Sequence, residues 1–447
     1  MTESIRLPEG LKNAYGFSLF NSICFQIYLS TPMILFARSL GASATVIGIL
    51  TGLTPLFTLL QIPGASLAER FGYKRLMCAG WVARTCFILV AVALPWLGGV
   101  WDNTTRTVVL LLSIAGFCLF RGITSSSWMP WLTALLPPDL RAYYMVREQT
   151  LMLLSGIGTF LLAGQMMGDK ASPMDFSLIF FISFCGGMAS VYFLKRIPDV
   201  PSEKTGGTAS PYPVPWRAIW NYRPFQKLLY LNLAWIVVSS TTPIYSVVML
   251  RESQCLTEGE IVNIMAAGFV GGITGLWTLG HVTDRFGSKP VMLIALFAQS
   301  ALMAGWSLLG WRFLPFHYAI IATLVFFSGL AASCFGVAYM RRLMGVVPEK
   351  GRSHFFALLF GVSSLVMAGM PLLWGIGIDF ASHLLESRER GVLSGCATLF
   401  CLSSFLSLML PFYLHSMPEE KSRHFDELLR EIFIAVPYRA FNRLLGH

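Results

Sequence analysis

Two short polar segments, residues 65–74 and 280–289, carry an acid, bases and a glycine in the same order. Each segment ends a long apolar run and leads at once into another, which is typical of a tight turn between two membrane helices. The segments therefore predict two equivalent polar turns. In chain order their charged residues and glycines are Glu69, Arg70, Gly72 and Lys74 in the first, and Asp284, Arg285, Gly287 and Lys289 in the second.

Arg121 is a charged residue inside a long apolar run, residues 107–135. It precedes Leu135 by 135 − 121 = 14 residues, or ~21 Å along a helix, which places it near the bilayer centre. A charged side chain there costs at least ~2.5 to 3.5 kcal/mol, so it should face the protein interior. It could bind an anionic substrate, pair with a carboxylate, or satisfy backbone carbonyls. We favour the anionic substrate, because Glu148 lies nearer the membrane surface and no other carboxylate is evident at matching depth.

Two further apolar runs carry polar side chains that must face protein or a watery cavity. In the first run, residues 13–37, these groups could equally bond neighbouring helices. In the seventh run they recur at intervals of three and four, which makes one stripe of a continuous helix. We expect both sets to complete a substrate pocket with Arg121. The candidate residues are Asn21, Gln26 and Tyr28 in the first run, and Asn232, Trp235, Ser239 and Thr242 in the seventh.

The chain is a duplication, because three groups of residues recur at a nearly constant offset. Such a parallel repeat is how many membrane transporters are built. The recurring groups are Arg70-Phe71-Gly72, Lys74 and Met77 as Arg285-Phe286-Gly287, Lys289 and Met292 (284 − 69 = 215); Asn21 with Thr31-Pro32 as Asn232 with Thr242-Pro243 (232 − 21 = 211); and Pro137 with Arg141 as Pro348 with Arg352 (348 − 137 = 211).

Composition identifies an integral membrane protein, since 55% of the 447 residues are hydrophobic and 13% are charged. About twelve apolar runs are each long enough to cross a bilayer core of ~30 Å. The formal net charge of +10 comes from bases in short loops rather than on one face, which argues against a nucleic-acid partner. Most Lys and Arg lie in the loops on the side that holds both termini. We therefore expect cytoplasmic termini. The localisation that we predict is a bacterial inner (plasma) membrane.

The two polar turns resemble the Gly-x-x-x-Asp-Arg-x-Gly-x-Lys signature loop of the major facilitator superfamily. The second copy is complete, whereas the first has Ala65 and Glu69 in place of the first glycine and the aspartate. The resemblance implies an all-α membrane protein with twelve transmembrane helices in two six-helix pseudo-symmetric bundles. It also implies that the two loops form a conformational latch. Glu69 would meet the helix that starts near His354, and Asp284 the helix that starts near Arg141, where an anion is worth ~0.3 to 1 kcal/mol.

Domain limits follow from the apolar runs and the composition between them. We predict an N-terminal six-helix bundle over residues 1–194 and a C-terminal one over residues 225–414. Residues 195–224, rich in Pro, Gly, Ser, Lys and Arg, form a cytoplasmic linker. Residues 415–447 place apolar side chains on one helical face and predict an amphipathic tail on the inner leaflet.

No catalytic, nucleotide-binding or metal-binding motif is present, so we predict neither an enzyme nor a cofactor or metal. The nine cysteines are scattered without a Cys-x-x-Cys pair and read as reduced thiols. We predict a secondary transporter that moves a small organic solute, bearing a carboxylate or phosphate, by alternating access. Its partners are that solute and membrane lipids; it is a monomer, and coupling to an ion stays open. The alternatives are an exporter of amphiphiles, drugs or lipids, and a transporter-like sensor without flux.

Overall fold

The computed structural model describes residues 10–199, 216–348, 352–384 and 388–417. Within these ranges, side chains are described except at residues 69, 138, 139, 142, 216–218, 278–286, 352, 353 and 388–390. The predicted amphipathic tail beyond Met417 therefore lies outside the described residues. So do the side chains of the two predicted latch acids, Glu69 and Asp284, and of Arg285.

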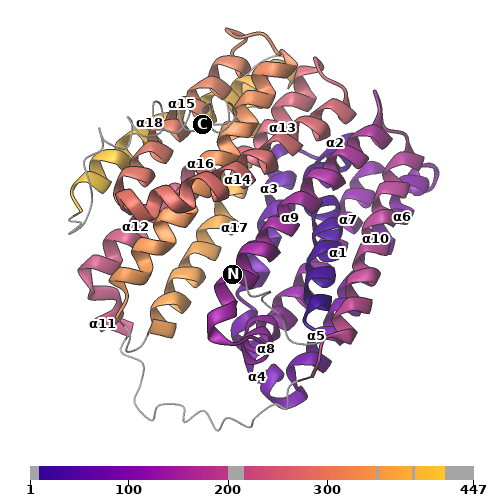
Figure 1. Ribbon diagram of the computed structural model, residues 1–447. Coiled ribbons are helices and arrows are strands. Elements are labelled where there is room, and N and C mark those ends of the chain that lie inside the picture. The colour runs from indigo at the N-terminus through magenta and orange to yellow at the C-terminus, as the bar shows by residue number, and fades with distance from the viewer. Residues whose placement is uncertain (1–9, 200–215, 349–351, 385–387, 418–447) are drawn as a thin grey trace, which may run out of the picture.

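The described residues form only helices, which confirms the predicted all-α fold. The chain up to residue 199 contributes one set of helices (Figure 1). Several spans consist of two or three consecutive helices separated by short breaks. These helices are α1 (Lys12–Tyr28), α2 (Thr31–Ser39), α3 (Ala44–Thr58), α4 (Gln61–Phe71), α5 (Tyr73–Cys86), α6 (Ile88–Ala93), η1 (Leu94–Gly99), α7 (Asn103–Thr124), η2 (Ser125–Ser127), α8 (Trp128–Leu135), α9 (Pro138–Met167) and α10 (Pro173–Arg196).

The second half repeats this arrangement with fewer breaks. Its helices are α11 (Trp216–Asn221), α12 (Arg223–Ser239), α13 (Thr242–Ser253), α14 (Glu258–Phe286), α15 (Ser288–Gly310), α16 (Tyr318–Val346), α17 (Arg352–Leu384) and α18 (Arg388–His415). Over the described residues, eleven spans are long and apolar enough to cross a membrane, and the pair α3–α4, bent by 41°, makes a twelfth. The predicted twelve transmembrane helices in two bundles are thus confirmed.

Proline breaks two helices that we expected to be continuous. A proline ring clashes with the carbonyl group four residues earlier and has no N–H to donate. Accordingly α1 ends at Tyr28, four residues before Pro32, and α12 ends at Ser239, four residues before Pro243. The predicted span over residues 13–37 is therefore one membrane span, Lys12–Ser39, made of two helices, and the polar stripe predicted through Thr242 is interrupted after Ser239. Both breaks fall at the same place in the two repeats.

Glycines allow helices to approach closely inside each bundle. A Cβ atom on Gly122 of α7 would overlap the carbonyl oxygen of Phe57 in α3, and one on Gly271 of α14 would overlap that of Phe326 in α16. These contacts are equivalent under the duplication, because each joins the second and fourth spans of its bundle. Gly271 therefore lies on a packing face inside its own bundle.

Replacing Gly271 with alanine should destabilise the protein, because the added methyl group would press on a backbone that cannot move aside. We expect a loss of about 1 to 3 kcal/mol, seen as a lower midpoint of thermal unfolding in detergent. Gly158→Ala is the matched control, since no atom lies within 4 Å of a Cβ at this exposed helical glycine. That variant should be neutral or gain about 0.5 to 1 kcal/mol. Equal midpoints for both variants would show that the close approach is not rigid.

Candidate functional site

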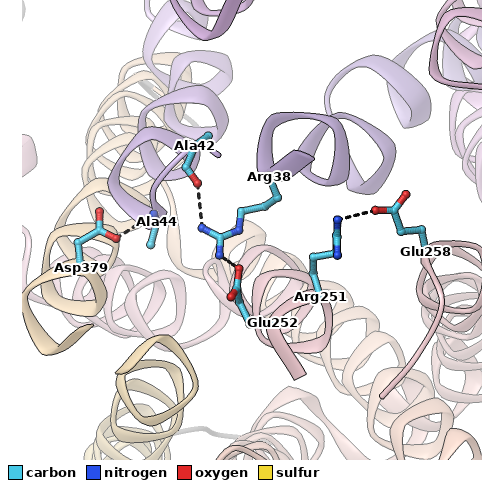
Figure 2. A network of polar contacts seen from close by, with 7 residues as sticks. All are labelled: Arg38, Ala42, Ala44, Arg251, Glu252, Glu258 and Asp379. Carbon is cyan, nitrogen blue, oxygen red and sulfur yellow. Dashed lines mark hydrogen bonds and ion pairs between the residues drawn. The ribbon is translucent and has the colours of Figure 1, made fainter. Parts of the chain in front are cut away.

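Polar contacts between the bundles gather at one end of the molecule, here called the closed end, opposite the linker end at which α10 ends and α12 begins (Figure 1). Figure 2 shows this network. Arg38 at the end of α2 forms an ion pair with Glu252 of α13, and its Nη1 also donates to the Ala42 carbonyl at 2.8 Å. The Arg38 side chain is 6% exposed, so water screens this pair little.

A carboxylate from the C-terminal bundle caps a helix of the N-terminal bundle. Oδ1 of Asp379, on α17, accepts from the Ala44 N–H at 3.0 Å (Figure 2). Oδ2 accepts from the Thr45 N–H at 2.8 Å. These are free N–H groups at the start of α3, where the helix dipole favours negative charge. Asp379 thus makes at the closed end the kind of contact that we predicted for the acids of the polar turns.

A third contact joins α14 to the loop between α9 and α10. Glu258 is held by Arg251 at 2.9 Å and accepts from the backbone N–H of Ala171 at 3.1 Å. Beside it, the Gly259 N–H donates to the Gly168 carbonyl at 2.9 Å. The hydrogen bonds of Ala171 and Gly168 join the two bundles at this end, as do the ion pair of Arg38 and the helix cap described above.

Two pairs of helices, α3 with α17 and α9 with α14, extend the contact between the bundles from the closed end toward the middle of the molecule. Cβ atoms on Gly48 and Gly52 of α3 would touch the backbone of α17 at Pro371 and Ala368. On the other pair, Phe160 of α9 and Phe269 of α14 pack edge to face with centroids 5.2 Å apart. Toward the linker the ribbons of the two bundles separate (Figure 1).

A cavity of about 320 Å³ lies where the two broken helices meet the aromatic pair. Ser30 and Thr31 line it from the first break, and Ser239, Thr242 and Pro243 from the second. Broken helices leave backbone groups unpaired, and such breaks are where transporters commonly bind their solutes. Here the hydroxyls of Ser240 and Thr241, at the second break, have no partner among the described residues.

Every residue that lines the cavity is uncharged. Seven carry a hydroxyl or amide group and three are aromatic, so the cavity can donate, accept and stack. The lining residues are Ser30, Thr31, Phe160, Ser239, Thr242, Pro243, Ser246, Met265, Gly268, Phe269, Gln299, Trp306, Val325, Ser328, Gly329 and Ala332.

Of the predicted substrate residues, Ser239 and Thr242 line this cavity, and the others lie elsewhere. Trp235 stacks on Phe335 with ring centroids 4.0 Å apart, and the Asn232 amide donates to the Ser363 hydroxyl at 2.8 Å. Tyr28 is fully buried in the N-terminal bundle, where its hydroxyl lies 2.7 Å from that of Ser113. Gln26 is half-buried, outside the lining of the cavity.

Asn21 belongs to a cluster around a second arginine, Arg84, which is 1% exposed. The Asn21 carbonyl oxygen accepts from Nη2 of Arg84, while the guanidinium lies over Trp81 at 4.1 Å and Phe117 at 4.9 Å. Nε and Nη1 of Arg84 have no partner among the described residues.

The predicted anion-binding residue, Arg121, lies half-buried with its guanidinium 4.9 Å from the Phe25 ring centroid. Neither Arg121 nor Arg84 forms an ion pair with any side chain that the structure describes. Arg121 is also absent from the residues that line the cavity.

In the two polar turns, the described glycines form the turn and the described lysines form hydrogen bonds within their own bundle. Gly72 and Gly287 have φ angles of 82° and 94°, which permit the tight turn. Lys74 donates to the Ile197 carbonyl at 2.8 Å, and Lys289 donates to the His415 and Met417 carbonyls at 2.9 Å. Each lysine thus stabilises the C-terminal end of its bundle's last span, a role that the sequence did not suggest. The Arg70 side chain is exposed.

Comparison with known proteins identifies the family to which this architecture belongs. The family model described as Major Facilitator Superfamily matches residues 15–371. A curated relative, the uncharacterized MFS-type transporter YhjO of Bacillus subtilis (strain 168), is 31% identical over 94 residues. That alignment spans 21% of this chain and 22% of the relative, about a fifth of each.

Solved transporter structures share the fold at low sequence identity. The nucleoside transporter NupG, in a mutant form, superposes with a TM-score of 0.70 at 13% identity, over 92% of this chain and 100% of that one. An inward-facing bacterial homologue of the iron transporter ferroportin gives 0.66 at 16% identity, over 91% and 99%. A D-xylose-proton symporter gives 0.64 at 13% identity, over 89% and 96%.

Replacing Asp379 with asparagine should favour opening of the closed end, because the charge that caps α3 is lost. A helix-terminal carboxylate is worth about 0.3 to 2 kcal/mol, or a shift of about two- to thirtyfold in the open population. The measurement is the rate at which an impermeant maleimide, added on that side, modifies a Ser30→Cys variant in a cysteine-free background.

Asp175→Asn is the matched control, because Asp175 makes the same type of helix cap with Ser172 inside the N-terminal bundle alone. Its modification rate should equal that of the parent. If Asp379→Asn also left the rate unchanged, the cap would not hold the closed end shut.

Proposed function

Because the chain belongs to the major facilitator superfamily, we propose that it moves a small organic solute across the membrane through the cavity between its two bundles. It is a secondary transporter rather than an enzyme. Rocking of the bundles would expose the cavity to each side in turn, which is alternating access. The energy would come from a solute or ion gradient.

The cavity at the two helix breaks carries this proposal. It combines residues of α2, α9, α12, α13 and α14, so it lies where relative movement of the bundles would reshape it. The contacts of Arg38, Glu258 and Asp379 close one side of it. With cytoplasmic termini, as the loop charges suggest, this conformation would face inward.

Two observations favour solutes of different charge. The cavity itself offers hydroxyl, amide and aromatic groups, which suits a neutral polar solute. The second candidate is the anionic solute expected from Arg121, because the half-buried guanidinium has no acidic partner that the structure describes. An anion bound there would lie in the N-terminal bundle near Phe25 instead of in the cavity.

Uptake by reconstituted vesicles tests both candidates with a panel of labelled neutral and anionic solutes. Ser328→Phe should reduce flux about tenfold or more, because the ring would fill part of the cavity. Thr323→Phe is the control, since Thr323 is exposed on the same helix, α16, and should leave flux unchanged.

An anion whose flux is lost in Arg121→Gln but kept in Ser328→Phe would favour the second candidate. Absence of flux for every solute in the wild-type protein would contradict the transport of a small organic solute and favour a sensor.

A further inference from the structure

We infer that the cavity recognises a neutral, planar solute that presents a hydrogen-bond donor beside an acceptor, and that Gln299 binds this edge. The inference rests on the proposed function, since it names the solute class of the same cavity. Such an edge is found in amides, lactams and imides.

Gln299 is a buried amide without a partner. It lies on α15, is 2% exposed and lines the cavity, and it forms no hydrogen bond with any described residue. A carboxamide has two donors and an acceptor with two lone pairs. A ligand in the cavity would supply hydrogen-bond partners that the described residues do not. The indole Nε1 of Trp306, another lining residue, is also buried without a partner.

The duplication allows Gln299 to be compared with the equivalent residue of the N-terminal bundle. Gln299 is the counterpart of Arg84, at the offset that relates the polar turns (299 − 84 = 215). In the N-terminal bundle the guanidinium of Arg84 is packed between Trp81 and Phe117 and bonded to Asn21. The same position in the C-terminal bundle carries a shorter, neutral side chain that borders an open cavity. The equivalent positions therefore differ: aromatic rings and Asn21 surround Arg84, whereas Gln299 borders a cavity that a solute could occupy.

The lining also restricts the charge and shape of the solute. A carboxylate in this cavity would be removed from water with no cation among the lining residues, which is strongly unfavourable. The rings of Phe160, Phe269 and Trp306 can stack on a planar solute. A glutamine amide bonds through both its oxygen and its nitrogen to an edge with an adjacent donor and acceptor, as it does with adenine. Together these features select a flat, uncharged ring with an amide-like edge.

Binding of matched neutral and anionic probes to the purified protein tests the inference without requiring transport. The pairs are uracil with orotate and nicotinamide with nicotinate, which share ring shape and differ by a carboxylate. Dissociation constants come from the concentration dependence of the thermal unfolding midpoint. We expect uracil or nicotinamide to bind the wild-type protein, and its anionic partner to bind at least about tenfold more weakly.

Gln299→Met, which keeps the length of the side chain but loses its polar atoms, should weaken binding of the neutral probe about tenfold or more. Gln299→Leu, which also removes both polar atoms, should do the same and guards against misfolding of the first variant. Gln165→Met is the control, because Gln165 is exposed on α9 and does not line the cavity. Its dissociation constant should match that of the wild type.

Tighter binding of orotate or nicotinate, equal binding to wild type and Gln299→Met, or binding of no probe would overturn the inference. The outcome is separable from that of the flux experiment. If the protein transports an anion but binds none of the neutral probes, the proposal of transport stands and the inference of a neutral planar solute is refuted. If a neutral probe binds in a way that depends on Gln299 but no solute is transported, the proposal of transport is refuted and the inferred binding site at Gln299 is supported.

Discussion

A hydrocarbon environment offers no water to backbone N–H and C=O groups, and the arrangement of this protein follows from that constraint. Every described span is helical, because only a helix satisfies its own backbone within one segment. Where Pro32 and Pro243 interrupt the helices, the freed groups must face protein or a polar cavity. The two breaks meet at one cavity, so the same constraint that enforces the helices also locates the site that we propose for the solute.

The two bundles share their helix packing but differ in the side chains that occupy their interiors. The glycine contacts around Gly122 and Gly271 and the turn lysines Lys74 and Lys289 are repeated faithfully, because each half must pack and end its helices. The interior of the N-terminal bundle is instead occupied by arginine, aromatic rings and Asn21, while that of the C-terminal bundle borders the cavity. Most residues that line the cavity belong to the C-terminal half, and Ser30, Thr31 and Phe160 belong to the N-terminal half.

Closure at one end depends on charges that reach across the bundle interface. The acids Glu252, Glu258 and Asp379 all belong to the C-terminal half, and they bind a side chain or backbone N–H groups of the N-terminal half. None of these contacts is apolar, so each can exchange its partner for water when the end opens. The glycine-lined contact of α3 with α17 gives the surfaces a close fit without bulky side chains to disengage.

The sequence predicted the fold better than the site, for physical reasons. Apolar runs and the repeat of residues such as Met77 and Met292 depend on local patterns, and they established the spans and the duplication. Pro32 and Pro243 mark the helix breaks, but Pro371 and Pro411 lie inside continuous helices, so proline alone does not predict a break. Gln299 could have been found by applying the offset to Arg84.

Other parts of the site required three-dimensional information. Asp379 and the start of α3 are 379 − 44 = 335 residues apart, and no local pattern connects them. Polar residues such as Tyr28 and Asn232 form hydrogen bonds with side chains of neighbouring helices, and their spacing in the sequence does not distinguish this role from binding a solute.

In the proposed transport cycle the two bundles rock, so that the closed end opens as the linker end closes. Spin-label distances measure this directly, in a cysteine-free protein with exposed labels at Val100 and Phe313 for the closed end and at Met145 and Met344 for the linker end. On introduction of Asp379→Asn, we expect a longer distance for the first pair together with a shorter one for the second. Distances that stay unchanged, or that lengthen at both ends together, would contradict alternating access in this protein.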